Sequence, residues 1–247
     1  MTITTTHHQS HQDRTSEAGN VLFLILIAVA LFAALSYAVT QSTRSGGGDA
    51  NNETNLVNSA QITQYPAGIK TSITRMIVSN GVTAEELEFN APAAFSSLTS
   101  NNVGVFHPSG GGATYAFAPD SVVDTTINAT KAWVFNTENE VQNIGQTDAA
   151  APTHDTADTI AFLPGVKLAI CQKIHAQLGL ATTFSTDETG INYVTQQTDA
   201  VGTATDHILT NATNGTIGAL ATELVGQPQG CFKDGTTYVY YHVLIER

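Results

Sequence analysis

The sequence predicts an α+β protein with an N-terminal transmembrane helix, an amphipathic helix and a β-rich globular head built from antiparallel hairpins. Three patterns predict this class: one long uncharged apolar run near the N-terminus, isoleucines at helical spacing, and short apolar segments separated by glycine- or proline-containing turns. We expect four parts: a hydrophilic leader over 1–19, a transmembrane helix over 20–42, a flexible glycine-rich break over 43–50 and a globular domain over 51–247.

The apolar run is the strongest of these signals. Residues 21–39 read VLFLILIAVALFAALSYAV, nineteen residues without a charge. A helix rises about 1.5 Å per residue, so this run nearly spans the ~30 Å hydrocarbon core of a bilayer. We therefore expect it to contact membrane lipid. A secretory signal peptide that ends at Ser36-Tyr37-Ala38 is the alternative, although the run exceeds the about 7–15 apolar residues usual in such peptides.

The cysteines indicate the side of the membrane on which the head lies. Arg14 precedes the run and Arg44 follows it, so the positive-inside rule favours neither orientation. Cys171 and Cys231 are the only cysteines, and a pair in an extracytoplasmic domain is more often a disulfide than two separate thiols. Two buried thiols and half of a zinc site are the alternatives. We expect a Cys171–Cys231 disulfide in a single-pass membrane protein whose C-terminal domain lies outside the cytoplasm.

A helix is expected after the glycine-rich break. Three consecutive glycines, 46–48, carry a high entropic cost in a helix and predict the break. From 51 to 79 the apolar residues fall at helical spacing, with Ile69, Ile73 and Ile77 in an i, i+4 stripe. Pro66 predicts a kink, because proline removes one helical hydrogen bond and clashes with the preceding turn. This helix packs either on the sheet of the head or among neighbouring subunits.

Short segments predict the rest of the head. Thr83, with Glu86 three residues later, predicts a capped helical turn. Glycine- and proline-rich or polar stretches separate apolar segments and predict two hairpins and one further strand: 102–107 with 113–118, 131–136 with 140–144, and 159–163.

The C-terminal third predicts a helix and a final hairpin. Residues 166–178 carry apolar side chains on one face, and Gly179 predicts the C-terminal end of this helix. Asp234-Gly235 is a strong two-residue hairpin signal that leads into the strand 238–245. Both faces of this strand are apolar, which predicts an interior strand that the disulfide ties to the helix.

Charge and motifs point away from several functions. The formal net charge of −12 argues against a nucleic-acid partner, because phosphate contacts need clustered Lys and Arg. The sequence contains no GxSxG, HExxH, P-loop or CxxC motif, so we expect no catalytic residue, no cofactor and no enzyme. His154, Asp155 and Asp158 fall in a loop-like segment, and the histidines at 7, 8 and 11 in a polar leader, so we expect no metal site.

The leader and the start of the apolar run carry a family resemblance. Residues 17–25, EAGNVLFLI, resemble the N-terminus of type IV pilin-like proteins (pilins, minor pilins and pseudopilins), where a short leader ends in Gly directly before an apolar helix. The resemblance implies cleavage by a prepilin peptidase between Gly19 and Asn20. The sequence departs from the family in carrying Leu24 where the fifth mature residue is usually Glu, and Asn20 where the first is usually aromatic or Met.

These observations lead to one functional expectation and one alternative. We expect a non-enzymatic, membrane-anchored bacterial envelope protein, and the resemblance implies a minor pilin or pseudopilin-like subunit whose partners are other pilin-like subunits. A membrane-anchored extracytoplasmic enzyme or ligand-binding domain, with a site assembled from scattered residues, is the alternative.

Overall fold

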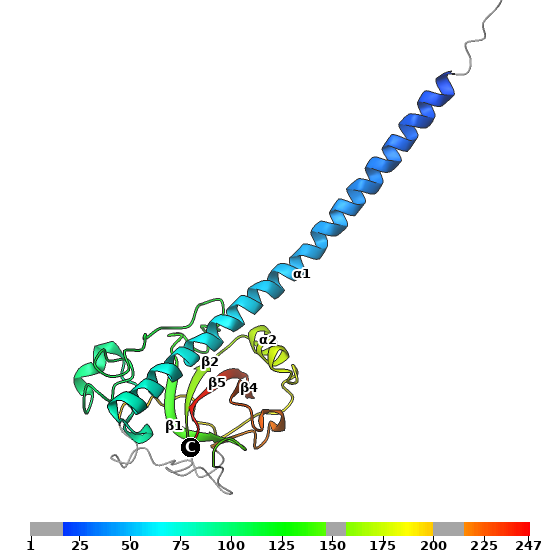
Figure 1. The fold of residues 1–247 in the computed structure, drawn as a ribbon. Coiled ribbons are helices and arrows are strands. Elements are labelled where there is room, and N and C mark those ends of the chain that lie inside the picture. Colours follow the sequence, from blue (N-terminus) through cyan, green and yellow to red (C-terminus); the bar gives the residue numbers. More distant parts are fainter. Residues whose placement is uncertain (1–16, 147–156, 200–214) are drawn as a thin grey trace, which may run out of the picture. The chain divides into compact units, whose positions relative to one another are not determined.

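The computed structural model describes residues 17–146, 157–199 and 215–247 and has mixed α+β architecture (Figure 1). The elements are α1 (Glu17–Asn80), η1 (Ala84–Glu86), η2 (Pro92–Ser97), β1 (Val134–Val141), β2 (Asp158–Pro164), α2 (Leu168–Leu178), β3 (Thr216–Ile217), η3 (Thr222–Leu224), β4 (Gln229–Asp234) and β5 (Thr237–Ile245). The chain divides into two compact units, 1–52 and 53–247, which are described separately below.

The described part of the first unit is helical. α1 begins at Glu17 and continues through residues 43–50, where the sequence predicts a flexible break. Each glycine lowers helix stability by about 1 kcal/mol relative to alanine but removes no backbone hydrogen bond, so a glycine run weakens a helix without ending it. Pro66, in the second unit, also lies inside α1, which continues to Asn80.

The second unit is built around a curled five-stranded sheet in the order β3-β1-β2-β5-β4. All neighbouring strands are antiparallel except β1 and β3, which pair in parallel. β5 lies between β2 and β4, as the apolar character of both its faces predicts. The α+β class is therefore confirmed.

Both faces of the sheet carry an apolar core. On one face α1 buries a stripe of its second half, Ile62, Ile69, Ile73 and Met76, in the same cluster as Trp133. The other face gathers a second cluster that contains Phe162, Phe232 and Val239. Full burial stabilises each side chain of this size by about 1.5–3 kcal/mol, so the α1 stripe contributes substantially to holding the helix on the sheet.

β5 contributes alternate residues to the two cores. Val239, Tyr241 and Val243 belong to one cluster, and Tyr240 and Leu244 to the other. Simple alternation would place Ile245 with Val243, but Ile245 packs against the cluster that contains Tyr240. The pairing with β2 shifts register between Thr159 and Ile160, and the extra residue that a bulge inserts reverses the alternation beyond it.

Two hairpins expected from the sequence do not form. In the first, residues 102–107 and 113–118 form turns and loop, and Gly104 makes a single parallel bridge to Glu88. A Cβ at Gly110 would lie 2.2 Å from the oxygen of Gly104, and one at Gly111 would lie 2.3 Å from that of Val105. These glycines therefore let the loop fold against its own backbone, and do not form a hairpin turn.

The second expected hairpin, 131–136 with 140–144, is replaced by the single strand β1. Its polar centre resembles a turn in sequence, yet residues 136–140 are buried. Asn136 Nδ2 donates to the oxygens of Asn192 and Thr195 at 3.0 Å, and Asn139 Nδ2 donates to that of Asn192 at 2.9 Å. A loop more than fifty residues away along the chain thus satisfies the polar side chains of this strand.

Candidate functional site

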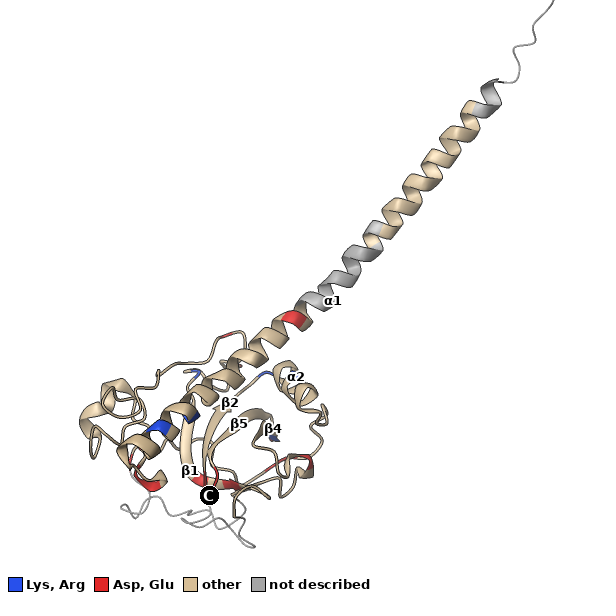
Figure 2. Ribbon diagram, viewed as in Figure 1, with Lys and Arg blue, Asp and Glu red and all other residues tan. Residues whose placement is uncertain are grey.

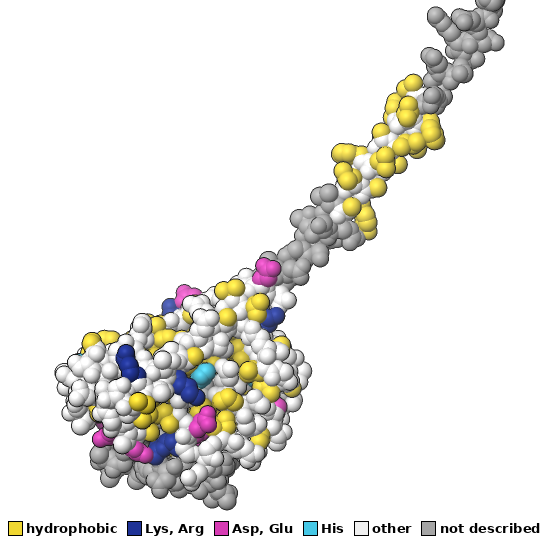
Figure 3. Space-filling view, in the orientation of Figure 1, with side chains coloured by type: hydrophobic (Ala, Val, Ile, Leu, Met, Phe, Trp, Pro, Cys, Tyr) yellow, Lys and Arg dark blue, Asp and Glu magenta, His cyan; other side chains and the backbone are white. Residues whose placement is uncertain are grey.

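The apolar segment Val21–Ala38 is the candidate site of the first unit. It is 18 residues long, is helical throughout, and has no residue buried. Leu22 is 68% exposed and Phe32 72% exposed. Figure 3 shows its apolar side chains bare on the helix, and Figure 2 shows no charged residue along it. Within the described residues this is the one helix long and apolar enough to cross a membrane.

The ends of this segment carry the residues of the processing prediction. Gly19 and Asn20 lie in the first turn of α1, where the backbone is helical. Leu24, at the fifth mature position, is 59% exposed. At the other end Thr40 Oγ1 donates to the oxygen of Ser36 at 2.7 Å, so this hydroxyl is satisfied within the helix itself. Cleavage between Gly19 and Asn20 stays a prediction.

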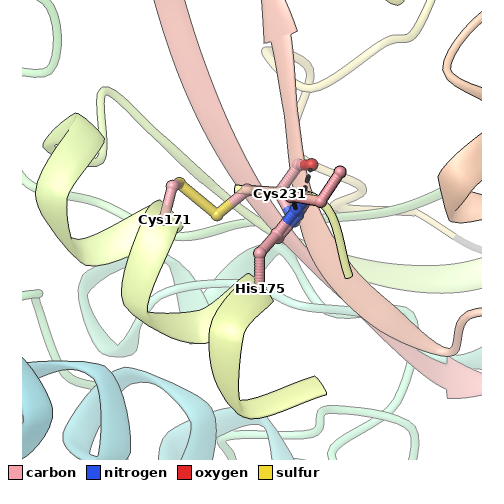
Figure 4. Close-up of a disulfide and its surroundings, with 4 residues drawn as sticks. Cys171, His175 and Cys231 are labelled. Atoms are coloured by element: carbon pink, nitrogen blue, oxygen red, sulfur yellow. Dashed lines mark hydrogen bonds between the residues drawn. A yellow bond between two sulfur atoms is a disulfide. The ribbon is translucent and has the colours of Figure 1, made fainter. Parts of the chain in front are cut away.

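The head contains the expected disulfide. Cys171 on α2 and Cys231 on β4 are bonded, with their Cα atoms 5.7 Å apart, and both are fully buried (Figure 4). α2 ends where the sequence predicts, because Gly179 adopts a left-handed conformation at φ 72°. The bond closes a loop of 60 residues, which by chain entropy stabilises the folded head by about 4 kcal/mol.

Buried carboxylates are the polar feature that sequence reasoning missed. Glu188 is fully buried and accepts the N–H groups of Gly218, Leu220 and Ala221 at 2.8–3.1 Å. Burial raises the pKa of the Glu188 carboxyl. Its partners lie 30–33 residues away in the chain, so no local pattern announces this contact. Glu188 acts as a clamp that joins its own loop to the segment after β3.

Asp158 has a similar role at the start of β2. Its two oxygens accept the N–H of Val141 at 2.9 Å and that of Arg247 at 3.0 Å. Burial raises the pKa of Asp158 to about 7. The Asp158 side chain therefore ties β2 to the end of β1 and to Arg247. Both of its oxygens are engaged by backbone N–H groups, so its role in this arrangement is structural.

The metal-binding candidates fall largely outside the described residues. Of the set His154, Asp155 and Asp158, only Asp158 is described, and the cluster His7, His8 and His11 also lies outside. In the ranges 17–146, 157–199 and 215–247, no group of three His, Cys, Asp or Glu side chains is placed to hold a metal ion.

Two hollows open on the head. One of about 500 Å³ lies between α1 and the loop 112–119. Its lining includes Tyr65 and Trp133, whose ring centroids are 5.1 Å apart. The other, about 630 Å³, is also lined by Trp133 and is bordered by Ile127 and Val194. Their lining residues include no charged side chain. Both volumes fall in the range of small-molecule sites, and uncharged walls suit a neutral ligand.

Tyr65 in the first hollow and Tyr193 in the second are not poised for proton transfer. Tyr65 Oη donates to the oxygen of Thr114 at 3.0 Å and accepts the N–H of Ala116 at 3.1 Å. Burial raises the pKa of Tyr65 to about 12, and burial together with the neighbouring Asp234 raises that of Tyr193 to about 12. Both hydroxyls therefore stay protonated at neutral pH and serve as hydrogen-bonding groups.

Comparison with known proteins adds no relative. The sequence matches no protein-family model, no match is found among curated proteins, and no solved structure is similar.

Proposed function

We propose that the chain is a non-enzymatic, single-pass membrane-anchored envelope protein and, more specifically, a minor pilin-like or pseudopilin-like subunit. The observation that carries this proposal is the bare apolar helix Val21–Ala38. Burying such side chains is worth about 25 cal/mol per Å², and no residue of this segment is covered by the chain itself. A lipid bilayer supplies that burial without any other partner.

The chemistry of the head supports a structural role over a catalytic one. The carboxylates of Asp158 and Glu188 are each engaged by backbone N–H groups, and the described hollows have uncharged walls. A disulfide suits an oxidising compartment outside the cytoplasm, which supports placing the head there.

The membrane claim is tested by placing charges in the apolar segment. Leu26→Lys with Val29→Lys costs about 6 kcal/mol of insertion free energy, so the double variant leaves membranes washed with alkaline carbonate while the unaltered chain stays in them. Val57→Lys with Val78→Lys is the matched control, since both valines are exposed on the second half of α1. If alkaline carbonate removes the unaltered chain from the membranes, the proposal that Val21–Ala38 is a membrane anchor is wrong.

The pilin-like claim is tested by processing and by neighbours. N-terminal sequencing of the membrane-extracted protein should find Asn20 first. An intact Met1, or a start after Ala38, contradicts prepilin-type cleavage. Crosslinking in intact cells followed by mass spectrometry should capture other proteins with an apolar N-terminal helix, and the absence of such proteins contradicts the subunit role.

A ligand-binding head is the second candidate function, and the hollow between α1 and 112–119 favours it. Gln61 and Gln64 are exposed amides beside this hollow, and Phe117 is a 57% exposed ring in its wall. Trp133 is the single tryptophan of the chain, so its fluorescence reports on both hollows. Titration with neutral sugars and short neutral peptides should shift this emission if the head binds them, and an unchanged spectrum rejects this candidate.

A further inference from the structure

The surroundings of the disulfide point to a second tie between the same two elements. Cys171 and His175 are four residues apart on α2 and therefore lie on one face of the helix, the face toward β4 (Figure 4). Cys171 bonds to the sulfur of Cys231, whereas His175 contacts the backbone of Cys231. One residue of β4 is thus held at two independent points.

The backbone contact of His175 is well defined. Its Nε2 lies 3.0 Å from the nitrogen and 2.9 Å from the oxygen of Cys231, and its Nδ1 lies 2.6 Å from the oxygen of Ala181. A carbonyl oxygen can only accept, so Nδ1 carries the hydrogen that it donates to the oxygen of Ala181. Nε2 lies within hydrogen-bond distance of both backbone groups of Cys231: it accepts the N–H when it carries no hydrogen and donates to the carbonyl oxygen when it carries one.

This contact also covers an exposed part of the sheet. β4 is the last strand in the sheet order, and an edge strand presents N–H and C=O groups without a strand partner. At Cys231 these groups contact His175. Two residues later along β4, the carbonyl oxygen of Lys233 accepts the N–H of Glu188 at 2.7 Å. His175 is fully buried, with the ring of Phe184 4.7 Å away, so water does not replace its contacts.

We propose that His175 is a positioning residue for the disulfide: it holds Cys231 beside Cys171 in the dithiol form and so favours closure of the bond. None of its three contacts involves sulfur, so they do not require the bond to exist. In the closing reaction the two thiols reduce one small-molecule disulfide such as oxidised glutathione. The S–S bond between Cys171 and Cys231 forms, the glutathione S–S bond breaks, and two glutathione thiols carry away both hydrogens. Holding the two cysteines together raises the equilibrium constant of this exchange.

The test is the thiol–disulfide equilibrium of the detergent-solubilised full chain against glutathione. His175→Leu keeps a similar volume but removes the polar contacts, and should lower the equilibrium constant about three- to tenfold, the range expected for one buried hydrogen bond. His175→Gln, whose amide can reach the same backbone groups, should restore most of this loss.

A matched control separates positioning from general destabilisation. Thr137→Val removes a different buried hydrogen bond, the 3.2 Å contact between the hydroxyls of Thr137 on β1 and Thr159 on β2. In the sheet, β5 separates these two strands from β4. It should leave the equilibrium constant unchanged within about twofold. Equal effects of His175→Leu and Thr137→Val, or no effect of His175→Leu, would overturn the proposal.

A second measurement needs no histidine variant. In the reduced, unaltered chain the backbone N–H of Cys231 should still exchange slowly with deuterated solvent, because its hydrogen bond to His175 persists without the disulfide. Exchange as fast as that of an exposed loop amide would show that the sulfur bond alone holds this residue, and would contradict the proposal.

Discussion

The two halves of α1 are one element of secondary structure but are stabilised in different ways. The segment Val21–Ala38 is apolar all round and has no residue buried. The segment 53–80 has an apolar stripe in which Ile69, Ile73 and Met76 are at most 2% exposed, and a mostly polar remainder. A helix with one apolar stripe packs on a protein core, whereas a helix that is apolar on every side needs an apolar solvent.

This difference teaches that the pattern of apolar residues, more than their number, decides which partner covers a helix. In the second half each buried isoleucine contacts the sheet core, so a substitution there acts on folding. In the first half no side chain contacts a core within the described residues, so a substitution there should leave folding of the head unchanged and, under the proposed membrane anchorage, act on insertion into lipid.

The largest expected effect is a loss of stability that follows burial. Ile73→Ala should destabilise the head by about 2–5 kcal/mol, because Ile73 is 1% exposed and its removal leaves a cavity. Leu26→Ala, in the exposed half, should leave the thermal unfolding of the head unchanged. Thermal melts of both variants in detergent check this prediction. Equal shifts would mean that the two halves are stabilised alike, which contradicts the comparison.

The next effect concerns pH, which should act on the head and not on the span. In the unfolded chain Asp158 has a pKa near 4, and in the folded head its pKa is raised to about 7. Between these values the folded state binds the proton and the unfolded state does not, so the free energy of unfolding falls as pH rises from about 4 to 7 and then levels. This titration of Asp158 changes the free energy of unfolding by an amount on the order of 2–4 kcal/mol.

Asp158→Asn removes this titration and is the variant that checks it. The difference in melting temperature between pH 5 and pH 8 should be smaller in Asp158→Asn than in the unaltered chain. The segment Val21–Ala38 contains no Asp, Glu, Lys, Arg or His. The fraction of protein that stays with membranes washed in buffer without carbonate should therefore not change between pH 5 and pH 8. An unaltered pH difference in the Asn variant would remove Asp158 as its source.

The parts predicted from the sequence share a local cause. The apolar run, the final hairpin with Gly235 at φ 57° and the end of α2 at Gly179 depend on residues close together in the chain. The disulfide is also expected from the sequence, because a cysteine pair in a domain assigned to the outside of the cytoplasm is more often bonded than free.

The parts that were missed depend on contacts distant in sequence. β1 looks like two strands and a turn because its polar centre is satisfied by Asn192, more than fifty residues later. The clamp at Glu188 depends on three N–H groups after β3, and the histidine contact behind the disulfide on a residue 56 positions away. Local patterns cannot reveal a buried polar residue whose partner belongs to another segment.

The smallest expected effect concerns two glycines of the head that both have room for a side chain but differ in backbone conformation. A Cβ at Gly68, on the exposed side of α1, would meet no atom within 4 Å, and the same holds at Gly235. Gly68 is inside a helix, where alanine is about 0.5–1 kcal/mol more stable than glycine, so Gly68→Ala should raise the melting temperature of the head by about 1–4 °C. Gly235 has φ 57°, which costs a side-chain-bearing residue about 1–2 kcal/mol, so Gly235→Ala should lower it. If Gly68→Ala also lowers it, the second half of α1 is not held as a regular helix on the head, and the contrast with the first half would rest on burial alone.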